Sequence, residues 1–129
     1  MTIAELCIPA ALLLIIATIG PAKVLGRRDY DNANPRDPRF YTPGFRARSQ
    51  GAHLNGYESF PFFIAAVLLA EMKGAPQGWA DMLAVGFLVA RIGYVACYLG
   101  DRPTARSVLW AVALGFNTAL FFLPLLARG

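Results

Sequence analysis

Charged residues are scarce in this sequence, and the scarcity indicates the class of protein. Only 16% of the 129 residues are Asp, Glu, Lys or Arg, whereas 57% are hydrophobic. A soluble domain usually has about 25% charged residues, so the composition favours a membrane protein. The net charge is +4, but seven of the twelve basic residues lie between Lys23 and Arg48. We expect no nucleic-acid partner, because the basic residues are not spread over a soluble surface.

Cysteine and histidine are also scarce. The sequence contains Cys7, Cys97 and a single histidine, His53, and it has no CxxC motif. Zinc sites usually require several cysteines or histidines at short spacings. We therefore predict that the protein has no metal site.

Long apolar segments, in contrast, fill most of the chain. A membrane-spanning helix needs about 20 residues, and a helix satisfies its own backbone hydrogen bonds in lipid. We predict an all-α membrane protein with a single domain, residues 1–129, built as a four-transmembrane-helix bundle. The predicted helices cover residues 3–24, 46–72, 79–99 and 104–127.

The connections between these segments differ in charge. Nine of the twelve Lys and Arg residues lie in or directly beside the 25–45 loop and the tight turn at 100–103, whereas the 73–78 turn contains only Lys73. The positive-inside rule then predicts that the 25–45 loop is cytoplasmic, and a bacterial inner membrane fits this pattern. Cys7 and Cys97 would lie near opposite faces of the membrane. Because a disulfide needs Cα atoms within about 7 Å, we predict two free thiols.

Polar side chains interrupt the predicted helices at one depth, near the cytoplasmic face. On the third helix they are spaced i, i+3 and i+7, so they form one stripe. An ionisable group inside a membrane segment is by default a functional-site hypothesis, and the pattern predicts a cationic pocket. The candidate residues are Arg48, His53, Asn55, Glu58, Arg91, Tyr94, Tyr98, Arg106 and Ser107.

Several arginines and one acid suit a ligand with more negative than positive charge. Arginine binds carboxylates through a two-pronged set of hydrogen bonds, and Glu58 could accept an ammonium group. Glutathione has two carboxylates, one ammonium and one thiol, so it matches this charge count, as do many other anions. An arginine near its sulfur would favour the thiolate over the thiol, whose free pKa is about 8.5.

Two stretches of the sequence resemble the MAPEG family (membrane-associated proteins in eicosanoid and glutathione metabolism). The first is residues 52–61, AHLNGYESFP, which is similar to the helix-two signature of that family. The second is residues 91–100, RIGYVACYLG, followed by Arg106 and Ser107. It resembles the corresponding region of the prostaglandin E synthase branch. The length and the four-helix plan agree, so the resemblance covers nearly the whole chain.

The resemblance implies a homotrimer with glutathione bound between neighbouring subunits. It implies that Asn55 and Glu58 hold glutathione and that Arg106 stabilises the thiolate. It also implies that aromatic and hydroxyl groups line the site, namely Tyr94, Tyr98 and Ser107. The sequence departs from the family pattern at Gly51 and Leu54, where related members have arginines, and at Tyr94, which is a histidine in the prostaglandin branch.

Two functions remain open at this stage. The leading hypothesis is a glutathione-dependent membrane transferase or peroxidase acting on lipophilic electrophiles or lipid hydroperoxides that arrive through the lipid bilayer. The alternative, motivated by Gly51 and Leu54, is a non-catalytic membrane subunit of a larger complex.

The polar residues also have structural interpretations. Asn55 and Glu58 could join helices, because polar pairs in membranes contribute roughly 0.6 kcal/mol on average, and Glu58 could pair with Arg91. Tyr94 and Tyr98 could form an interfacial aromatic belt. Arg106 could be a cytoplasmic anchor, and for His53 we expect a structural hydrogen bond.

Overall fold

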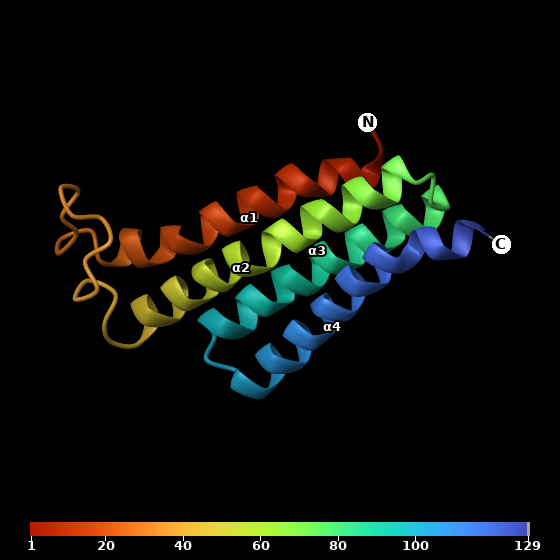
Figure 1. The fold of residues 1–129 in the computed structure, drawn as a ribbon. Coiled ribbons are helices and arrows are strands. Elements are labelled where there is room, and N and C mark those ends of the chain that lie inside the picture. The colour runs from red at the N-terminus through yellow and green to blue at the C-terminus, as the bar shows by residue number, and fades with distance from the viewer. Residues whose placement is uncertain (129) are drawn as a thin grey trace.

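The computed structural model describes residues 1–128, all of them in helices, turns and loops. Four α-helices lie side by side, and each runs antiparallel to the next along the chain (Figure 1). The 26–44 loop and the α3–α4 turn lie at one end of the bundle, here called the loop end, and both termini lie at the other. The elements are α1 (Ile3–Leu25), α2 (Phe45–Met72), α3 (Gln77–Leu99), α4 (Pro103–Phe122) and the 3-10 helix η1 (Leu123–Arg128).

The fourth helix differs from the prediction at its end. The sequence predicts a helix over residues 104–127, but the α-helix ends at Phe122 and a 3-10 helix continues the chain. Pro124 lies in this last part. Proline has no backbone N–H for the α-helical ladder, which favours the change here, although α1 and α2 continue as α-helices through Pro9, Pro21 and Pro61.

The core lies between the helices toward the end that carries the termini. Phe63 on α2 stacks on Phe87 on α3, with ring centroids 4.1 Å apart. Alanines such as Ala66 and Ala84 fill the contacts around this pair, and both are fully buried. Small residues let helix backbones approach closely, which is how helices pack in membranes.

Three helical segments are long and apolar enough to cross a membrane: Ile3–Leu25, Gln77–Leu99 and Pro103–Ala127. Their outer faces expose large apolar side chains, for example Leu13, Val89 and Val112, and lipid is the natural solvent for such faces. Although α2 is the longest helix, it is not among these segments, because it is less apolar than the other three α-helices. Its polar residues lie mainly in the half near the loop end.

The 26–44 loop folds onto the start of α2 instead of extending away from it. The Tyr41 hydroxyl donates a hydrogen bond to the Pro35 carbonyl at 2.8 Å. Arg46 on α2 forms an ion pair with Asp29 at 2.8 Å, and its guanidinium lies 4.7 Å from the centroid of the Phe40 ring. The loop therefore closes one side of the loop end.

Candidate functional site

A cavity of about 390 Å³ opens between α2, α3 and α4 in the half of the bundle near the loop end. Pockets for small molecules usually have about 300–1,000 Å³, so its size suits a ligand. We call it the site cavity. Its lining residues are Gly51, Asn55, Glu58, Tyr94, Tyr98, Arg106, Ser107 and Trp110. The structure thus brings most of the residues predicted from the sequence to one place.

Arg91 lies next to the site cavity and fixes the side chain of Asn55, which lines it. Its side chain is only 5% exposed, and its Nη1 donates a hydrogen bond to Asn55 Oδ1 at 2.8 Å. Asn55 Nδ2 in turn donates to Glu58 Oε2 at 3.4 Å. Within residues 1–128 no direct ion pair joins Arg91 and Glu58. Asn55 therefore connects the two charges, and the exposed carboxylate of Glu58 can still accept hydrogen bonds from a ligand.

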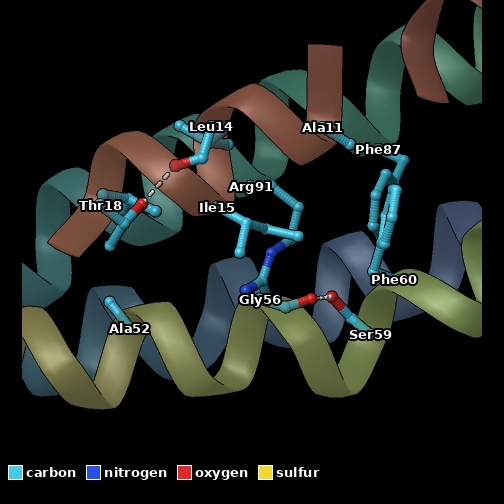
Figure 2. Close-up of a pocket in the computed structure, with 11 residues that line it drawn as sticks. Ala11, Leu14, Ile15, Thr18, Ala52, Gly56, Ser59, Phe60, Phe87 and Arg91 are labelled. Atoms are coloured by element: carbon cyan, nitrogen blue, oxygen red, sulfur yellow. Dashed lines mark hydrogen bonds between the residues drawn. The ribbon is translucent and has the colours of Figure 1, made fainter. Parts of the chain in front are cut away.

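Figure 2 shows how Arg91 reaches its place. The side chain leaves α3 and directs its guanidinium toward α2, near Gly56. The cavity beside it measures only about 10 Å³, close to the smallest volume that holds one water molecule. Nearby hydroxyls bond to their own helices: Thr18 donates to the Leu14 carbonyl and Ser59 to the Gly56 carbonyl. This packing fixes the guanidinium and leaves no room for a ligand on that side.

Two arginines, Arg91 on α3 and Arg106 on α4, flank a pair of tyrosine rings at the site cavity. The guanidinium of Arg91 lies 4.1 Å from the centroid of the Tyr94 ring, and that of Arg106 lies 4.7 Å from the Tyr98 ring. The two tyrosine rings meet edge to face, 5.7 Å apart. Cation–π contacts of this kind stabilise and orient both partners. Tyr94 is only 4% exposed, so it lies inside the bundle and not in an interfacial belt.

Arg106 is the cation best placed to meet a ligand. It lies in the first turn of α4, is half-buried, and forms no ion pair with any described residue. The N-terminus of a helix carries a partial positive charge and free N–H groups. Arg106 and the start of α4 therefore make this wall of the cavity attractive to an anion, and the exposed Ser107 adds a hydroxyl.

Arg48 lines an adjoining cavity of about 280 Å³ that shares Tyr98 and Arg106 with the site cavity. Arg102 also lines it. The Nε atom of Arg48 is buried and has no hydrogen-bond partner among the described residues. The structure thus places Arg48 next to the site cavity, on the other side of Tyr98.

His53 lies on a different face of α2 and lines a separate hollow against α1 and the 26–44 loop. Its Nδ1 lies 2.6 Å from the Ile15 carbonyl oxygen of α1, and its ring meets that of Tyr57 edge to face. One turn earlier, the Ser49 hydroxyl donates to the Thr18 carbonyl at 2.6 Å. The structure therefore does not bring His53 to the site cavity, and its contact is one that joins α1 to α2.

Two lining residues, Gly51 and Trp110, were not among the predicted site residues. A Cβ atom added to Gly51 would overlap the Tyr98 hydroxyl, so the glycine makes room for that ring. Helical spacing could have revealed both residues, because Gly51 lies four positions before Asn55 and Trp110 four positions after Arg106.

Together these observations define a class: a helical membrane protein with a cationic, aromatic-walled cavity between its helices. The model of the MAPEG family matches residues 3–126, and the chain belongs to that family. The comparisons with curated proteins and with solved structures gave no match. The family match confirms the resemblance noted in the sequence and, with the three long apolar helical segments, makes this a multi-pass membrane protein. The MAPEG family comprises membrane proteins of the glutathione-related transferase and peroxidase type.

The groups around the site cavity fit glutathione chemically. Arg106 and the neighbouring Arg48 can meet carboxylates or a thiolate, and Glu58 can accept hydrogen bonds from an ammonium group. The tyrosines and Trp110 supply apolar walls beside these charges. This set of donors and acceptors matches a ligand with two carboxylates, one ammonium and one thiol.

Proposed function

We propose that this protein is an integral membrane transferase or peroxidase that uses glutathione at the site cavity and acts on lipophilic electrophiles or lipid hydroperoxides. The observation that carries the proposal is the position of Arg106, a cation without an acidic partner among the described residues, facing the Asn55–Glu58 pair across one cavity. Membership of the MAPEG family supports the same chemistry.

Each residue has a role in this proposal. Glu58 binds the ammonium group of glutathione, and Asn55, held by Arg91, orients Glu58. Arg106 stabilises the sulfur as a thiolate, because a nearby positive charge lowers the pKa of a thiol. Glutathione, when bound, supplies the nucleophile. The protein therefore contributes orientation and electrostatic stabilisation, which are the main sources of catalysis when no protein group reacts covalently.

The atoms balance in both reactions. With an electrophile, a carbon–sulfur bond forms and the leaving group departs with the electron pair of the bond that breaks. With a hydroperoxide, the O–O bond breaks and the lipid oxygen takes up a proton to become an alcohol. Two molecules of glutathione are then oxidised to the disulfide, and one molecule of water is released.

We also propose the assembly that the family resemblance implies and the orientation that the Lys and Arg pattern predicts. Three copies form a homotrimer, so that a neighbouring subunit helps to enclose the open side of the site cavity. The 26–44 loop faces the cytoplasm of a bacterial inner membrane, and glutathione enters from there. The lipophilic substrate reaches the cavity from the bilayer, along the apolar outer face of α4.

Calorimetric titration of glutathione into the detergent-purified protein tests the function. We expect the wild type to bind glutathione with a rise in thiolate absorbance, and Arg106→Ala to lose that absorbance. Arg28→Ala is the matched control, because it removes an exposed arginine of the loop that contacts none of these groups. If the wild type does not bind glutathione, or if both variants behave alike, the proposed function is wrong.

A second function is favoured by one observation. The Tyr98 ring occupies the space that a side chain at position 51 would fill, and Leu54 lines the hollow on the α1 side. Neither of the two positions that hold arginines in related members therefore offers a cation to the site cavity. A protein that keeps the fold as a non-catalytic subunit of a larger membrane complex would show no glutathione binding and would co-purify with that complex.

A further inference from the structure

A second cationic cavity lies at the loop end, beside the turn between α3 and α4. It is the cavity of about 280 Å³ that adjoins the site cavity, and we call it the turn cavity. Arg48, Arg102 and Arg106 contribute three positive charges to its lining, and Asp101 contributes one negative charge. Tyr98 and Arg106 line both cavities, so the two cavities share one wall.

The three arginines of the turn cavity have their hydrogen-bonding groups available. Within residues 1–128, no guanidinium N–H of Arg48, Arg102 or Arg106 donates a hydrogen bond, and none of the three forms an ion pair. Arg91, in contrast, donates to Asn55. Only the Nε atom of Arg48 is buried without a partner, so its terminal Nη atoms remain accessible from the cavity.

The start of α4 adds a further positive potential to the turn cavity. Arg102 is the N-cap residue and Pro103 follows it as the first helical residue, and both line the cavity. No side chain among the described residues caps the helix. The first turn of a helix has free N–H groups and a partial positive charge, so this helix start favours an anion and does not compete for it.

The lining restricts what that anion is. Its charges leave a net charge of +2. Arg48 reaches the cavity from α2, whereas Arg102 and Arg106 reach it from the start of α4, so the donors come from two walls. Guanidinium groups donate to carboxylate and phosphate oxygens in pairs. A carboxylate has two oxygens in one plane, but a phosphate group offers three or more in a tetrahedral arrangement. A phosphate group therefore matches three converging arginines better.

We propose that the turn cavity binds a phosphate group, from a phospholipid headgroup or from a free phosphate, and that Arg106 couples this site to the site cavity. The phosphate accepts hydrogen bonds from all three arginines. Because Arg106 carries a single positive charge, an anion on the turn side of Tyr98 withdraws part of that charge from the site cavity. Each anion then weakens the binding of the other, since coupling between two sites is reciprocal. The phosphate site stands on its own geometry, whereas its effect on glutathione rests on the proposed function.

Calorimetric titration of inorganic phosphate tests the site without glutathione. The protein is purified in a phosphate-free detergent, and chloride keeps the ionic strength constant. We expect the wild type to bind phosphate and Arg102→Gln to weaken binding about tenfold, the effect of a lost charge-assisted hydrogen bond. Arg28→Gln is the matched control, because Arg28 is exposed and lines neither cavity. No binding by the wild type, or equal behaviour of the two variants, would refute the proposal.

Asp101→Asn is a variant that should gain affinity for phosphate. Asp101 has a backbone φ of +56°, a left-handed conformation that asparagine also adopts readily, so the turn keeps its shape. Removal of a like charge from the lining should strengthen phosphate binding about twofold to fivefold, the size expected for an exposed charge. Unchanged or weaker binding by a folded Asp101→Asn protein would show that phosphate binds elsewhere.

A bilayer experiment distinguishes the two sources of the phosphate group. The protein is placed in nanodiscs of an uncharged, phosphate-free galactolipid, with or without a small fraction of phosphatidylglycerol. If a lipid headgroup is the ligand, phosphatidylglycerol competes with inorganic phosphate and lowers its apparent affinity in the wild type. If free phosphate is the ligand, its affinity is the same in both kinds of nanodisc. Phosphate binding that Arg102→Gln does not weaken in either nanodisc would overturn the site.

A last titration measures the coupling to glutathione. As phosphate rises at constant ionic strength, we expect the dissociation constant of glutathione to rise about fivefold to tenfold and then to level off. In Arg102→Gln it should stay constant over the same range. A rise without a plateau in both proteins means that phosphate occupies the site cavity itself, which refutes a separate site. Phosphate binding that depends on Arg102, in a protein that does not bind glutathione, refutes the proposed function and leaves the phosphate site intact. Glutathione binding without phosphate binding does the reverse.

Discussion

The two faces of α2 use polar residues in opposite ways. Toward α1, Ser49 and His53 each contact a carbonyl oxygen of that helix at 2.6 Å, and Ser49 is fully buried. Toward α3 and α4, Asn55 bonds to Arg91 while Glu58 receives only a long hydrogen bond and remains exposed. Polar groups that join helices are thus paired within the chain, whereas those around the site cavity keep part of their bonding capacity free.

Carboxylates at the two ends of the bundle show the same difference. At the end with the termini, Asp81 Oδ1 accepts hydrogen bonds from the Ala4 backbone and from Gln77, at 2.9 and 2.8 Å. Glu71 accepts from Thr2 at 2.7 Å and also from Gln77. These acids connect helices and have their partners at hand. Glu58 is an acid with room for a ligand, which supports a binding role over a purely structural one.

Among the variants that test this difference between the polar groups, Arg91→Met is expected to have the largest effect. In Arg91→Met, Asn55 loses the partner that holds it, while the long apolar side chain keeps much of the packing. Hydrogen bonds to charged groups contribute about 1.5–3 kcal/mol, so we expect glutathione affinity to fall about 10- to 100-fold, as measured by calorimetry. The melting temperature should change little, because the substitution leaves no buried charge without a partner: Asn55 is neutral and Glu58 is exposed. A large loss of stability with unchanged affinity would show that Arg91 belongs with the structural polar groups.

A smaller effect is expected at Gly51. In Gly51→Ala the new methyl group overlaps the Tyr98 hydroxyl, so the ring must move and Arg106 loses its contact with it. Overpacking of this kind costs about 1–3 kcal/mol, and we expect lower thermal stability together with weaker glutathione binding. Gly20→Ala is the matched control, because nothing lies within 4 Å of a Cβ there. Gly20→Ala should instead stabilise its helix by about 0.5–1 kcal/mol. Equal behaviour of the two variants would contradict the role given to Gly51.

Ser49→Ala tests the opposite face of α2. It removes the hydrogen bond that the Thr18 carbonyl oxygen accepts from the Ser49 hydroxyl, and this loss lowers the free energy of unfolding by about 1 kcal/mol. We expect a lower melting temperature in detergent and an unchanged dissociation constant for glutathione. Weaker glutathione binding at unchanged stability would contradict the division between the two faces.

Sequence pattern was sufficient for the helices and for much of the candidate site. The apolar runs led to four helices, and the i, i+3, i+7 stripe on α3 led to Arg91, Tyr94 and Tyr98. For His53, helical spacing alone argues against a place in the site. It lies two residues before Asn55, which is about 200° around a helix, so the two side chains face different neighbours. Which carbonyl each polar group meets depends on how the helices pack, and no local pattern shows that.

Asn117 shows a second limit. It is the sole amide in the apolar run of residues 107–127, so its presence was visible in the sequence, and an intramembrane polar residue is a reason to look for a site. The Oδ1 atom of Asn117 has no hydrogen-bond partner among the described residues, and side chains from three helices surround it. This missing hydrogen bond becomes visible only when the packing of the helices is known.

The smallest effect is expected at Asp37, an acid of the 26–44 loop that is paired and partly exposed to water. The Arg39 side chain and backbone N–H donate hydrogen bonds to it, and they lower the pKa of Asp37 from its ordinary value. Its stabilising contribution is therefore present above the pKa of the unfolded chain and is lost as the pH falls through the lower pKa of the folded protein. We expect Asp37→Asn to lower the melting temperature slightly at about pH 7 and to match the wild type at about pH 2, well below the ordinary pKa. In an Arg39→Gln background, which keeps the backbone hydrogen bond to Asp37, the same substitution should have a smaller effect at about pH 7. A pH-dependent difference of undiminished size without the Arg39 side chain would show that this pairing is not what distinguishes Asp37 from Glu58.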